Sequence, residues 1–443
     1  MPRELLATTV LLLVLILGLA EWAVAAEPEL EVKLTFAPPF SLACSGNVQL
    51  FFLPESKLAQ KPYLPPEAWL LLEEGALLQG TTWEISLEQG EIVFRAAGRE
   101  GEAFRSKLPL LLRGAKGSEI KLNGRLYSGT IQFWPGEQLS VFNRLGLEDY
   151  VAGVLSSEAY ASWPLEALKA NAVAIRTYTL YSLGKHEIFD LCDQVHCQVY
   201  RGLHHLPVFK EAVAATQGQV LTWNGKLIEA VYHSSSGGRT RNNDEVWASP
   251  PLPYLRAVED FDQAGRNYYW PQAYLVSLDE LARALGFSAG QRIELSPFLS
   301  PAGDRLGFVF FATKQQEKKR FRNEELRRLF SFPSANFRVL VVKEQALPAG
   351  ISTRRGVNQG AAVLNNQENR LQLARTVQGV GRLVTGTVTL EPGESLLFFG
   401  NGSGHGVGLS QWGAVALAER DYSYQEILRH YYGDEVRFAS LGE

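Results

Sequence analysis

The spacing of apolar residues changes near Leu147, and this change constrains the fold more than any other feature of the sequence. From about Leu30 to Trp134, short apolar stretches alternate with polar residues between Gly, Pro and Asn residues. A period of two with such punctuation is typical of β-strands. After Leu147 the spacing becomes helical, with hairpins between the helices. We therefore predict an α+β fold, in which a helical region with β-hairpins and a cleft follows a β-rich N-terminal region.

The first 26 residues have the layout of a secretory signal. Arg3 precedes an apolar run from Leu5 to Ala20, and small residues close the segment at Val24 to Ala26. About 16 apolar residues are short of the roughly 20 that span a bilayer, although Trp22 to Ala26 could extend the run. A cleaved signal and an uncleaved anchor therefore both remain open. In either case we expect an extracytoplasmic protein that is secreted, periplasmic or anchored to the cell envelope by this segment.

The charge balance excludes one class of partner. Lys and Arg number 43 against 47 Asp and Glu, which leaves a formal net charge of −4. Such a chain lacks the broad positive field that non-specific nucleic-acid binding needs, so we expect no nucleic-acid partner. A hydrophobic content of 46% with 11% aromatic residues also excludes a disordered chain.

The rest of the chain shows no internal repeat and no low-complexity linker. We therefore divide the sequence into residues 1–26, a β-rich N-terminal region over 27–120 and one continuous domain over 121–443. Within that domain, residues 255–400 carry few chemical signals and read as scaffold. The tract Gln315–Arg328 is rich in charged and amide side chains, which predicts an exposed helix.

Glu158 carries the first chemical signal. Val151, Val154, Leu155 and Glu158 follow one another at i, i+3, i+4 and i+7, which is one face of a helix. A carboxyl group in an apolar setting has a raised pKa, as a general acid working near neutral pH requires. The alternative is that Glu158 ends its helix in solvent or pairs with a cation, for which Lys169 and Arg176 are the candidates.

Two histidines and two cysteines lie within twelve residues: His186, Cys192, His196 and Cys197. Two nitrogens and two sulfurs are the ligand set of a tetrahedral structural zinc site. The spacing is not that of a zinc finger, and a disulfide between Cys192 and Cys197 would suit an exported protein. Metal site, disulfide and two free thiols therefore remain as interpretations of this segment.

A hairpin with an Asn224-Gly225 turn is expected between Gln219 and Tyr232, and its second strand leads into a Ser- and Gly-rich loop. Ser234 and Ser235 in this loop are candidates for binding a hydroxyl-rich ligand. His233 beside Ser234 also permits a Ser/His nucleophile, but the sequence holds no nucleophile elbow that would support it.

Near the C-terminus, glycine occupies every even position from 400 to 408. No frame of this segment supplies a dinucleotide or phosphate-loop motif, so we expect no organic cofactor. What remains is a tight loop that presents His405, Ser410 and Gln411 and then begins a helix. Close backbone packing explains the glycines as well as function does.

Taken together, these segments resemble the family of stage II sporulation protein D and the amidase enhancer LytB. The resemblance extends from about Gly124 to Tyr432. It rests on Asn143, Leu147-Glu148-Asp149-Tyr150, Gly153-Val154, Ser157-Glu158, Pro164 to Ala170, Ala172-Val173-Ala174, Arg176-Thr177-Tyr178, Cys192-Asp193, His196 to Tyr200, His233 to Gly238, Gly404 to Gly408 and Ser410 to Gly413.

Enzymatic members of this family are lytic transglycosylases of peptidoglycan, and the resemblance places their catalytic acid at Glu158. It also implies a zinc-binding loop formed by the His/Cys set. Under this reading the domain over 121–443 is catalytic, and peptidoglycan glycan strands are the substrate. Ser234, Ser235, His405, Ser410 and Gln411 would then line the cleft and hold glycan hydroxyl and acetamido groups.

The other branch of the resemblance implies a different class of function, a non-catalytic wall-binding protein that stimulates a cell-wall amidase or another wall hydrolase. Such a protein would need the cleft but not the proton transfer. A hydrolase is a third reading, since Asp244 or Glu245 could supply a second carboxylate. The chain departs from the family at Ala159-Tyr160, where many relatives have Met-Pro, and at Asn171, where they usually have Gln.

Overall fold

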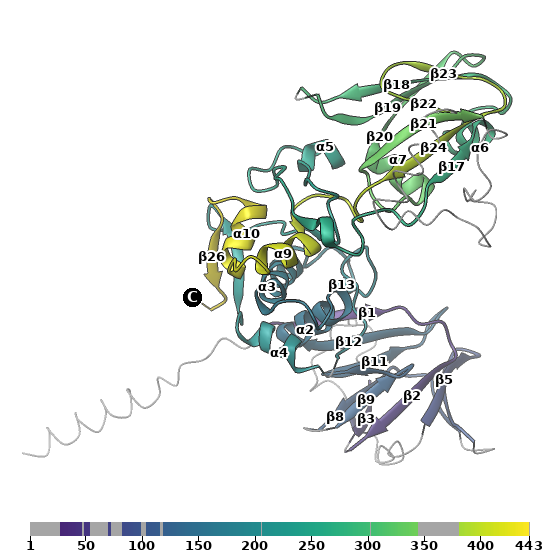
Figure 1. The fold of residues 1–443 in the computed structure, drawn as a ribbon. Coiled ribbons are helices and arrows are strands. Elements are labelled where there is room, and N and C mark those ends of the chain that lie inside the picture. The colour runs from purple at the N-terminus through teal and green to yellow at the C-terminus, as the bar shows by residue number, and fades with distance from the viewer. Residues whose placement is uncertain are drawn as a thin grey trace, which may run out of the picture.

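The computed structural model describes residues 27–46, 48–53, 70–71, 82–98, 103–115, 118–204, 206–301, 303–343 and 381–442. The expected signal over residues 1–26 lies outside these ranges. Among the described helices, none is long and apolar enough to cross a membrane. The fold is mixed α+β with a strand-rich N-terminal part, as predicted (Figure 1).

Two antiparallel sheets make up most of the N-terminal part. Their strands are β1 (Glu29–Leu34), β2 (Phe40–Ser45), β3 (Val48–Phe52), β4 (Leu70–Leu71), β5 (Thr82–Glu88), β6 (Glu91–Ala96), β7 (Ala103–Ser106), β8 (Leu110–Gly114), β9 (Glu119–Leu122), β10 (Arg125–Tyr127), β11 (Thr130–Trp134), β12 (Ser140–Gly146) and β13 (Leu191–Cys192). One sheet has the order β13-β1-β12-β11-β8-β3-β4, in which β13 joins β1 in parallel, and the other has the order β10-β9-β2-β5-β6-β7.

The two sheets pack face to face through buried aromatic side chains. The ring of Phe133 on β11 lies 6.1 Å from that of Phe40 on β2 and 5.7 Å from that of Phe94 on β6. The apolar core between the sheets continues into the helical part of the chain, because Phe133 and Leu168 belong to the same buried cluster. The strands run on to Gly146, beyond the boundary expected at residue 120.

The helical part follows directly. It contains α2 (Leu147–Glu158), α3 (Leu165–Tyr181), α4 (Pro207–Ala214), β14 (Gln219–Trp223), β15 (Lys226–Leu227), β16 (Tyr232–His233), α5 (Asn243–Trp247), β25 (Leu409–Ser410), α9 (Gln411–Ala418), α10 (Tyr424–Tyr432) and β26 (Arg437–Ser440). Helix α3 packs against α2, α4, α9 and α10. Its buried alanines, among them Ala167, Ala170 and Ala174, allow this crowding because their side chains are short.

A third part is inserted between the helices and returns to them near Gly400. It contains β17 (Tyr274–Ser277), α6 (Leu278–Ala284), β18 (Ile293–Leu299), β19 (Arg305–Ala312), β20 (Glu317–Arg322), α7 (Asn323–Phe330), β21 (Phe337–Lys343), β22 (Gly381–Leu383), β23 (Val388–Leu390) and β24 (Glu394–Gly400). Two four-stranded sheets enclose an apolar core of their own, and Figure 1 shows this part as a separate lobe.

The charged tract Gln315–Arg328 is only partly helical, which corrects the expectation of one exposed helix. Residues Glu317–Arg322 form β20, and the helix α7 begins at Asn323. Strand β20 pairs with β19 over its whole length, and the guanidinium of Arg320 lies 3.8 Å from the ring centroid of Phe298. Cross-strand pairing and contacts between cations and aromatic rings therefore outweigh the helix propensity of these residues.

Candidate functional site

A cavity of about 720 Å³ lies where the end of α2, the short β16–β25 ladder and helix α7 come together. It is lined by Glu158, Tyr178, Lys185, Val195, His196, Cys197, Gln198, Val199, Glu229, Val231, Tyr232, His233, Ser234, Trp247, Glu324, Arg327, Arg328, Gly404, His405 and Gln411. Residues far apart in the sequence therefore form one site, and several of the predicted residues are among them.

Glu158 is the last residue of α2 and faces this cavity, half-buried. Its Oε1 accepts a hydrogen bond from the Val199 backbone N–H at 3.3 Å. Burial raises the pKa of Glu158, against the opposing effects of the Val199 N–H, the Gln411 side chain and Arg201. The carboxyl group thus keeps its proton at higher pH than an exposed glutamate does.

The two cations considered as partners of Glu158 form ion pairs with other carboxylates. Lys169 Nζ lies 2.7 Å from Glu166, and Arg176 forms a buried ion pair with Glu148 on the first turn of α2. Glu158 is therefore neither a solvent-exposed helix end nor half of an ion pair with either cation.

The end of α2 is fixed by the segment from Lys185 to Arg201, which we call the His/Cys loop. A Cβ atom at Gly153 would lie 2.4 Å from the Tyr200 ring, so the loop can approach the helix this closely only because residue 153 is glycine. The Ser157 hydroxyl accepts a hydrogen bond from the Arg201 N–H at 3.1 Å. Together with the bond from Val199, this contact ties the carboxyl group of Glu158 to the His/Cys loop.

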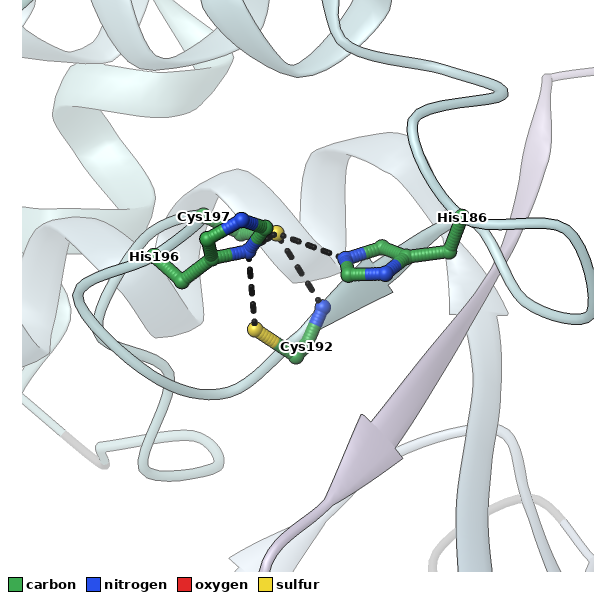
Figure 2. A group of neighbouring side chains, drawn as sticks. All are labelled: His186, Cys192, His196 and Cys197. Carbon is green, nitrogen blue, oxygen red and sulfur yellow. Dashed lines mark hydrogen bonds between the residues drawn. The ribbon is translucent and has the colours of Figure 1, made fainter.

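The four predicted ligands converge in the His/Cys loop (Figure 2). One ligand atom from each of His186, Cys192, His196 and Cys197 lies within 4.8 Å of all the others. His186 Nε2 lies 3.2 Å from Cys197 Sγ, and His196 Nδ1 lies 3.6 Å from Cys197 Sγ and 3.9 Å from Cys192 Sγ. Both cysteines are free thiols in the structure. Adjacent His196 and Cys197 point to the same side because they lie in a turn and not in a strand.

The His/Cys loop is also anchored to the N-terminal sheet through β13. The Asp190 carboxylate accepts a hydrogen bond from the Glu31 N–H at 2.8 Å, and the Asp193 carboxylate accepts one from the Thr35 N–H at 3.1 Å. These bonds hold the two ends of β13 beside β1. The strand-rich N-terminal part therefore supports one wall of the cavity.

The hairpin with the Asn224-Gly225 turn forms as predicted, with β14 and β15 paired across it, but its second strand is shorter than expected because β15 ends at Leu227 and does not run to Tyr232. The chain then enters β16, which pairs in parallel with β25, so that His233 lies opposite Ser410. This ladder brings together the Ser-rich and Gly-rich motifs.

Of the two serines predicted to bind ligand, only Ser234 lines the cavity, where its Oγ accepts a hydrogen bond from Asn267 at 2.9 Å. Ser235 is 1% exposed, and its hydroxyl donates to the Asp262 carboxylate. Neighbouring residues of an extended chain face opposite sides, which explains why Ser234 faces the cavity and Ser235 faces the interior. Ser235 therefore holds the loop in place and does not contact a ligand in the cavity.

The segment Gly400–Gly413, which we call the glycine loop, forms another part of the cavity wall through Gly404, His405 and Gln411. A Cβ atom at Gly404 would lie 2.7 Å from His233 Cβ, and one at Gly408 would lie 2.2 Å from the Val231 carbonyl oxygen. Both glycines also have positive φ angles. The alternating glycines therefore serve close backbone packing, which places His233 and Gln411 at the cavity.

His405 and Gln411 line the cavity, whereas Ser410 does not. Ser410 is fully buried and caps α9, because its hydroxyl accepts a hydrogen bond from the Gly413 N–H. Both ring nitrogens of His405 are engaged: Nε2 donates to the Tyr232 carbonyl at 2.9 Å, and Nδ1 accepts from the Val407 N–H at 3.1 Å. Burial lowers the pKa of His405 well below its ordinary value, so the ring is neutral.

The sequence did not reveal several members of the cavity wall. Glu229 lies on it, and burial raises the pKa of this carboxyl group, with Lys185 opposing. Its position between the apolar residues Ile228 and Ala230 was a signal in the sequence, of a different kind from the helical spacing that pointed to Glu158. Arg327 and Arg328 of α7 also line the cavity, so the inserted part is more than scaffold.

The residues considered for a hydrolytic carboxylate pair lie outside the cavity wall. Asp244 is paired with Arg256 at 2.7 Å, and the Glu245 carboxylate accepts a hydrogen bond from Asn242. Trp247 also lines the cavity, whereas Tyr254 is 9% exposed and belongs to the core.

Comparisons with known proteins agree with the motifs. Residues 135–223 match the family model of the stage II sporulation protein, SpoIID. The chain is 30% identical over 375 residues to the amidase enhancer of Bacillus subtilis (strain 168), which covers 82% of this chain and 50% of that relative. It is 28% identical over 365 residues to the stage II sporulation protein D of Bacillus amyloliquefaciens, covering 78% of this chain and 86% of that relative.

The stage II sporulation protein D of Bacillus subtilis (strain 168) is 26% identical over 305 residues, which cover 65% of this chain and 72% of that relative. The chain thus spans about half the length of the amidase enhancer and more of the two sporulation proteins. These matches confirm the resemblance to the stage II sporulation protein D and amidase-enhancer family.

Proposed function

We propose that this chain, which carries a stage II sporulation protein domain, cleaves peptidoglycan glycan strands as a lytic transglycosylase with Glu158 as its catalytic acid and base. The family match and the amidase-enhancer relative support a function related to the cell wall. The observation that carries the finer proposal is a carboxyl group with a raised pKa on the wall of a large cavity.

The chemistry needs one carboxyl group. Protonated Glu158 donates its proton to the glycosidic oxygen as the bond from that oxygen to the muramoyl C1 breaks. The carboxylate then removes the proton from the C6 hydroxyl of the same sugar, and the C6 oxygen bonds to C1. The products are a strand with a 1,6-anhydro-muramoyl end and a strand with a free 4-hydroxyl. Glu158 regains its proton, and no water is consumed.

We further propose that His186, Cys192, His196 and Cys197 hold a structural zinc ion. Zinc bonds of about 2.3 Å to sulfur and 2.0–2.1 Å to nitrogen place tetrahedral ligands roughly 3.4–3.8 Å apart. The distances of 3.2, 3.6 and 3.9 Å between these side chains agree with that donor set. Four protein ligands leave no open position, so the ion would stabilise the His/Cys loop and the Val199 N–H that contacts Glu158.

A second candidate function is that of a wall-binding protein that stimulates an amidase. Identity to the amidase enhancer of Bacillus subtilis favours it. In that case the cavity would bind glycan, and the proton of Glu158 would not be used. The extracytoplasmic location belongs to both functions and rests on the signal expected over residues 1–26.

The deciding experiment is digestion of purified sacculi with the wild type, Glu158→Gln, Glu229→Gln and Glu245→Gln, followed by mass spectrometry of the released fragments. The lytic mechanism predicts anhydromuropeptides from the wild type and from Glu245→Gln, whose carboxylate lies outside the cavity. Glu158→Gln should lose at least about a hundredfold in rate, as expected when a general acid is removed.

Other outcomes separate the alternatives. Fragments with reducing muramoyl ends, lost in both Glu158→Gln and Glu229→Gln, would indicate hydrolysis by a carboxylate pair. Release of no fragments by any variant, together with binding to sacculi, would favour the wall-binding protein. Equal release by the wild type and Glu158→Gln would exclude the Glu158 mechanism.

A further inference from the structure

Three aromatic side chains that do not line the cavity form a cluster beside it: Tyr160, Trp163 and Trp412. The ring centroid of Tyr160 lies 5.7 Å from that of Trp163 and 6.0 Å from that of Trp412, and the two tryptophan rings lie 5.2 Å apart. We call this cluster the aromatic platform. Its members differ in exposure, because Trp163 is 6% exposed and Tyr160 is 46% exposed.

The backbone holds the aromatic platform in place. The Trp163 N–H donates to the Tyr160 carbonyl at 3.0 Å and closes the turn between α2 and α3. The Trp412 N–H, on the first turn of α9, donates to the Ser234 carbonyl at 3.1 Å. A Cβ atom at Gly265 would lie 2.7 Å from Cγ of Trp412, so the chain at Gly265 packs directly against this indole. The rings are therefore ordered without a ligand, which lowers the entropy cost of binding one.

The aromatic platform adjoins the cavity wall at two points. Tyr160 is two residues beyond Glu158, so at most about 7 Å separates their Cα atoms. Trp412 follows Gln411 and bonds to Ser234, and both of these residues line the cavity. A glycan strand with one glycosidic bond at Glu158 can therefore bring a neighbouring sugar to the aromatic platform.

A packing role accounts for Trp163 but not for Tyr160. Tyr160 contacts two indoles and still leaves nearly half of its surface in water. An aromatic ring that is held from one side and exposed on the other offers a rigid apolar surface, which is typical of ligand sites. Tyr160 also lies at a position where many relatives have proline, so the aromatic platform distinguishes this chain from those relatives.

We propose that the aromatic platform binds a pyranose ring of the glycan strand outside the cavity, by stacking of the sugar on the ring of Tyr160. A β-1,4-linked pyranose carries C–H groups on its faces and hydroxyl groups around its rim. Stacking removes these C–H groups and the tyrosine ring from water while the hydroxyl groups stay hydrated. The inference rests on the proposed function for its ligand, and it adds a binding site beyond the bond at Glu158.

The experiment measures the affinity of the full chain carrying Glu158→Gln for a β-1,4-linked hexasaccharide of N-acetylglucosamine, by calorimetry. Binding to phosphatidylcholine vesicles is measured in parallel, because exposed Tyr and Trp side chains also favour membrane interfaces. In this parent we add Tyr160→Ala, Tyr160→Phe or the control Tyr422→Ala. Tyr422 is 43% exposed and lies beyond the end of α9 at Ala418, outside the cavity wall.

We expect Tyr160→Ala to weaken hexasaccharide binding by about three- to tenfold, the effect of one lost ring contact. Tyr160→Phe keeps the ring and should bind like the parent, and Tyr422→Ala should also change nothing. An unchanged affinity of Tyr160→Ala would overturn the proposal. So would an equal loss in Tyr160→Phe, which would show a hydrogen bond to the phenol hydroxyl, and so would a parent that does not bind the hexasaccharide. Loss of vesicle binding with unchanged sugar affinity would assign the aromatic platform to a membrane surface instead.

Should Tyr160→Ala fail to fold, the ring resonances of Tyr160 in the parent provide a second test. They are identified by their absence from the spectrum of Tyr160→Phe. Saturation with the hexasaccharide should shift them, and unmoved resonances would overturn the proposal. A chain that loses affinity in Tyr160→Ala but does not cut sacculi when Glu158 is intact keeps this inference and loses the proposed function. A chain that cuts sacculi and binds the hexasaccharide equally well with or without the Tyr160 ring does the reverse.

Discussion

The His/Cys loop and the glycine loop line the same cavity, but different features hold each of them in place. The His/Cys loop brings four side chains together at one point, where a metal ion would cross-link them. The glycine loop omits side chains, so that its backbone can lie against Val231 and His233. With zinc bound as proposed, the His/Cys loop would depend on a component that can be removed, whereas the glycine loop depends on space that a side chain would fill.

This difference predicts which kind of change destabilises each of the two loops. Loss of a metal-binding side chain would lower the stability of the His/Cys loop by the free energy of metal binding. The size of that effect varies with the metal concentration. Addition of a single carbon atom affects the glycine loop through repulsion between atoms, which no solution condition relieves. Four changes test this difference between the two loops, and they are given in order of their expected effect on stability.

The largest effect should come from Gly408→Ala. Its Cβ would lie 2.2 Å from the Val231 carbonyl oxygen at a φ of +70°. A left-handed alanine costs about 1–2 kcal/mol and an overpacked site about 1–3 kcal/mol, so the free energy of unfolding should fall by roughly 2–5 kcal/mol. Urea denaturation measures this. Gly386→Ala is the control, because nothing lies within 4 Å of its Cβ. Equal stability of the two variants would refute the packing role of the glycine loop.

The second effect concerns metal removal. With free zinc a hundredfold above its dissociation constant, chelation should lower the free energy of unfolding by about 3 kcal/mol. Hydrogen exchange should then rise in the His/Cys loop and stay unchanged at the Val407 N–H of the glycine loop. Cys197→Ser should abolish the response to chelator, whereas Cys44→Ser, which changes a buried cysteine of β2, should retain it. Two cysteines that resist alkylation until reduced would instead establish a disulfide.

A smaller effect follows from the pKa of Glu158. Burial raises this pKa in the folded chain, so the folded state holds the proton more tightly than the unfolded state does. Stability is therefore lost as pH rises from the ordinary value of 4.5 through the raised folded pKa. We expect Glu158→Gln to melt at a higher temperature than the wild type at pH 8, with the gap closing at pH 4.

Glu166→Gln is the matched control of opposite sign. Burial tends to raise the pKa of Glu166, but hydrogen bonds from Lys169 and the Tyr424 N–H lower it overall. Its charged form stabilises the fold above the ordinary pKa, so Glu166→Gln should melt lower than the wild type at pH 8. Thermal melts of both variants at the two pH values check the signs. Lower stability of Glu158→Gln at pH 8 would contradict the raised pKa.

The smallest effect should come from Val195→Ser. Val195 lies in the His/Cys loop beside His196, one of the proposed zinc ligands, yet it is 85% exposed. The melting temperature and zinc content should both stay within error, since exposed substitutions usually change stability by less than about 0.5 kcal/mol. A clear loss of zinc would show that the ligands depend on the whole loop and not on their own positions.

Features that depend on neighbours in the sequence could be predicted from it. The apolar face ending at Glu158, the turn at Asn224-Gly225 and the clustering of His186 with Cys197 all follow from periodicity or short spacing. Such patterns predict the relative positions of the residues, because helix and hairpin dimensions are nearly constant.

Features that depend on long-range packing could not be predicted. Whether Ser234 or Ser235 faces the cavity depends on the register of β16 against β25, which the local sequence does not determine. Arg327 and Arg328 reach the cavity through a part of the chain with its own core, and nothing near them indicates that position. Glu229 could have been recognised by another local pattern, since it stands between the apolar residues Ile228 and Ala230.

The pairing of β1 has a consequence for the order in which the chain folds. The Glu31 N–H bonds to a carboxylate 159 residues later, and β1 lies between β12 and β13. Contacts so distant in sequence close large loops and form slowly. During synthesis from the N-terminus, β1 must wait until Cys192 has emerged before both of its edges are covered. Pairing of both edges of β1 and assembly of the His/Cys cluster therefore depend on the same stretch of chain.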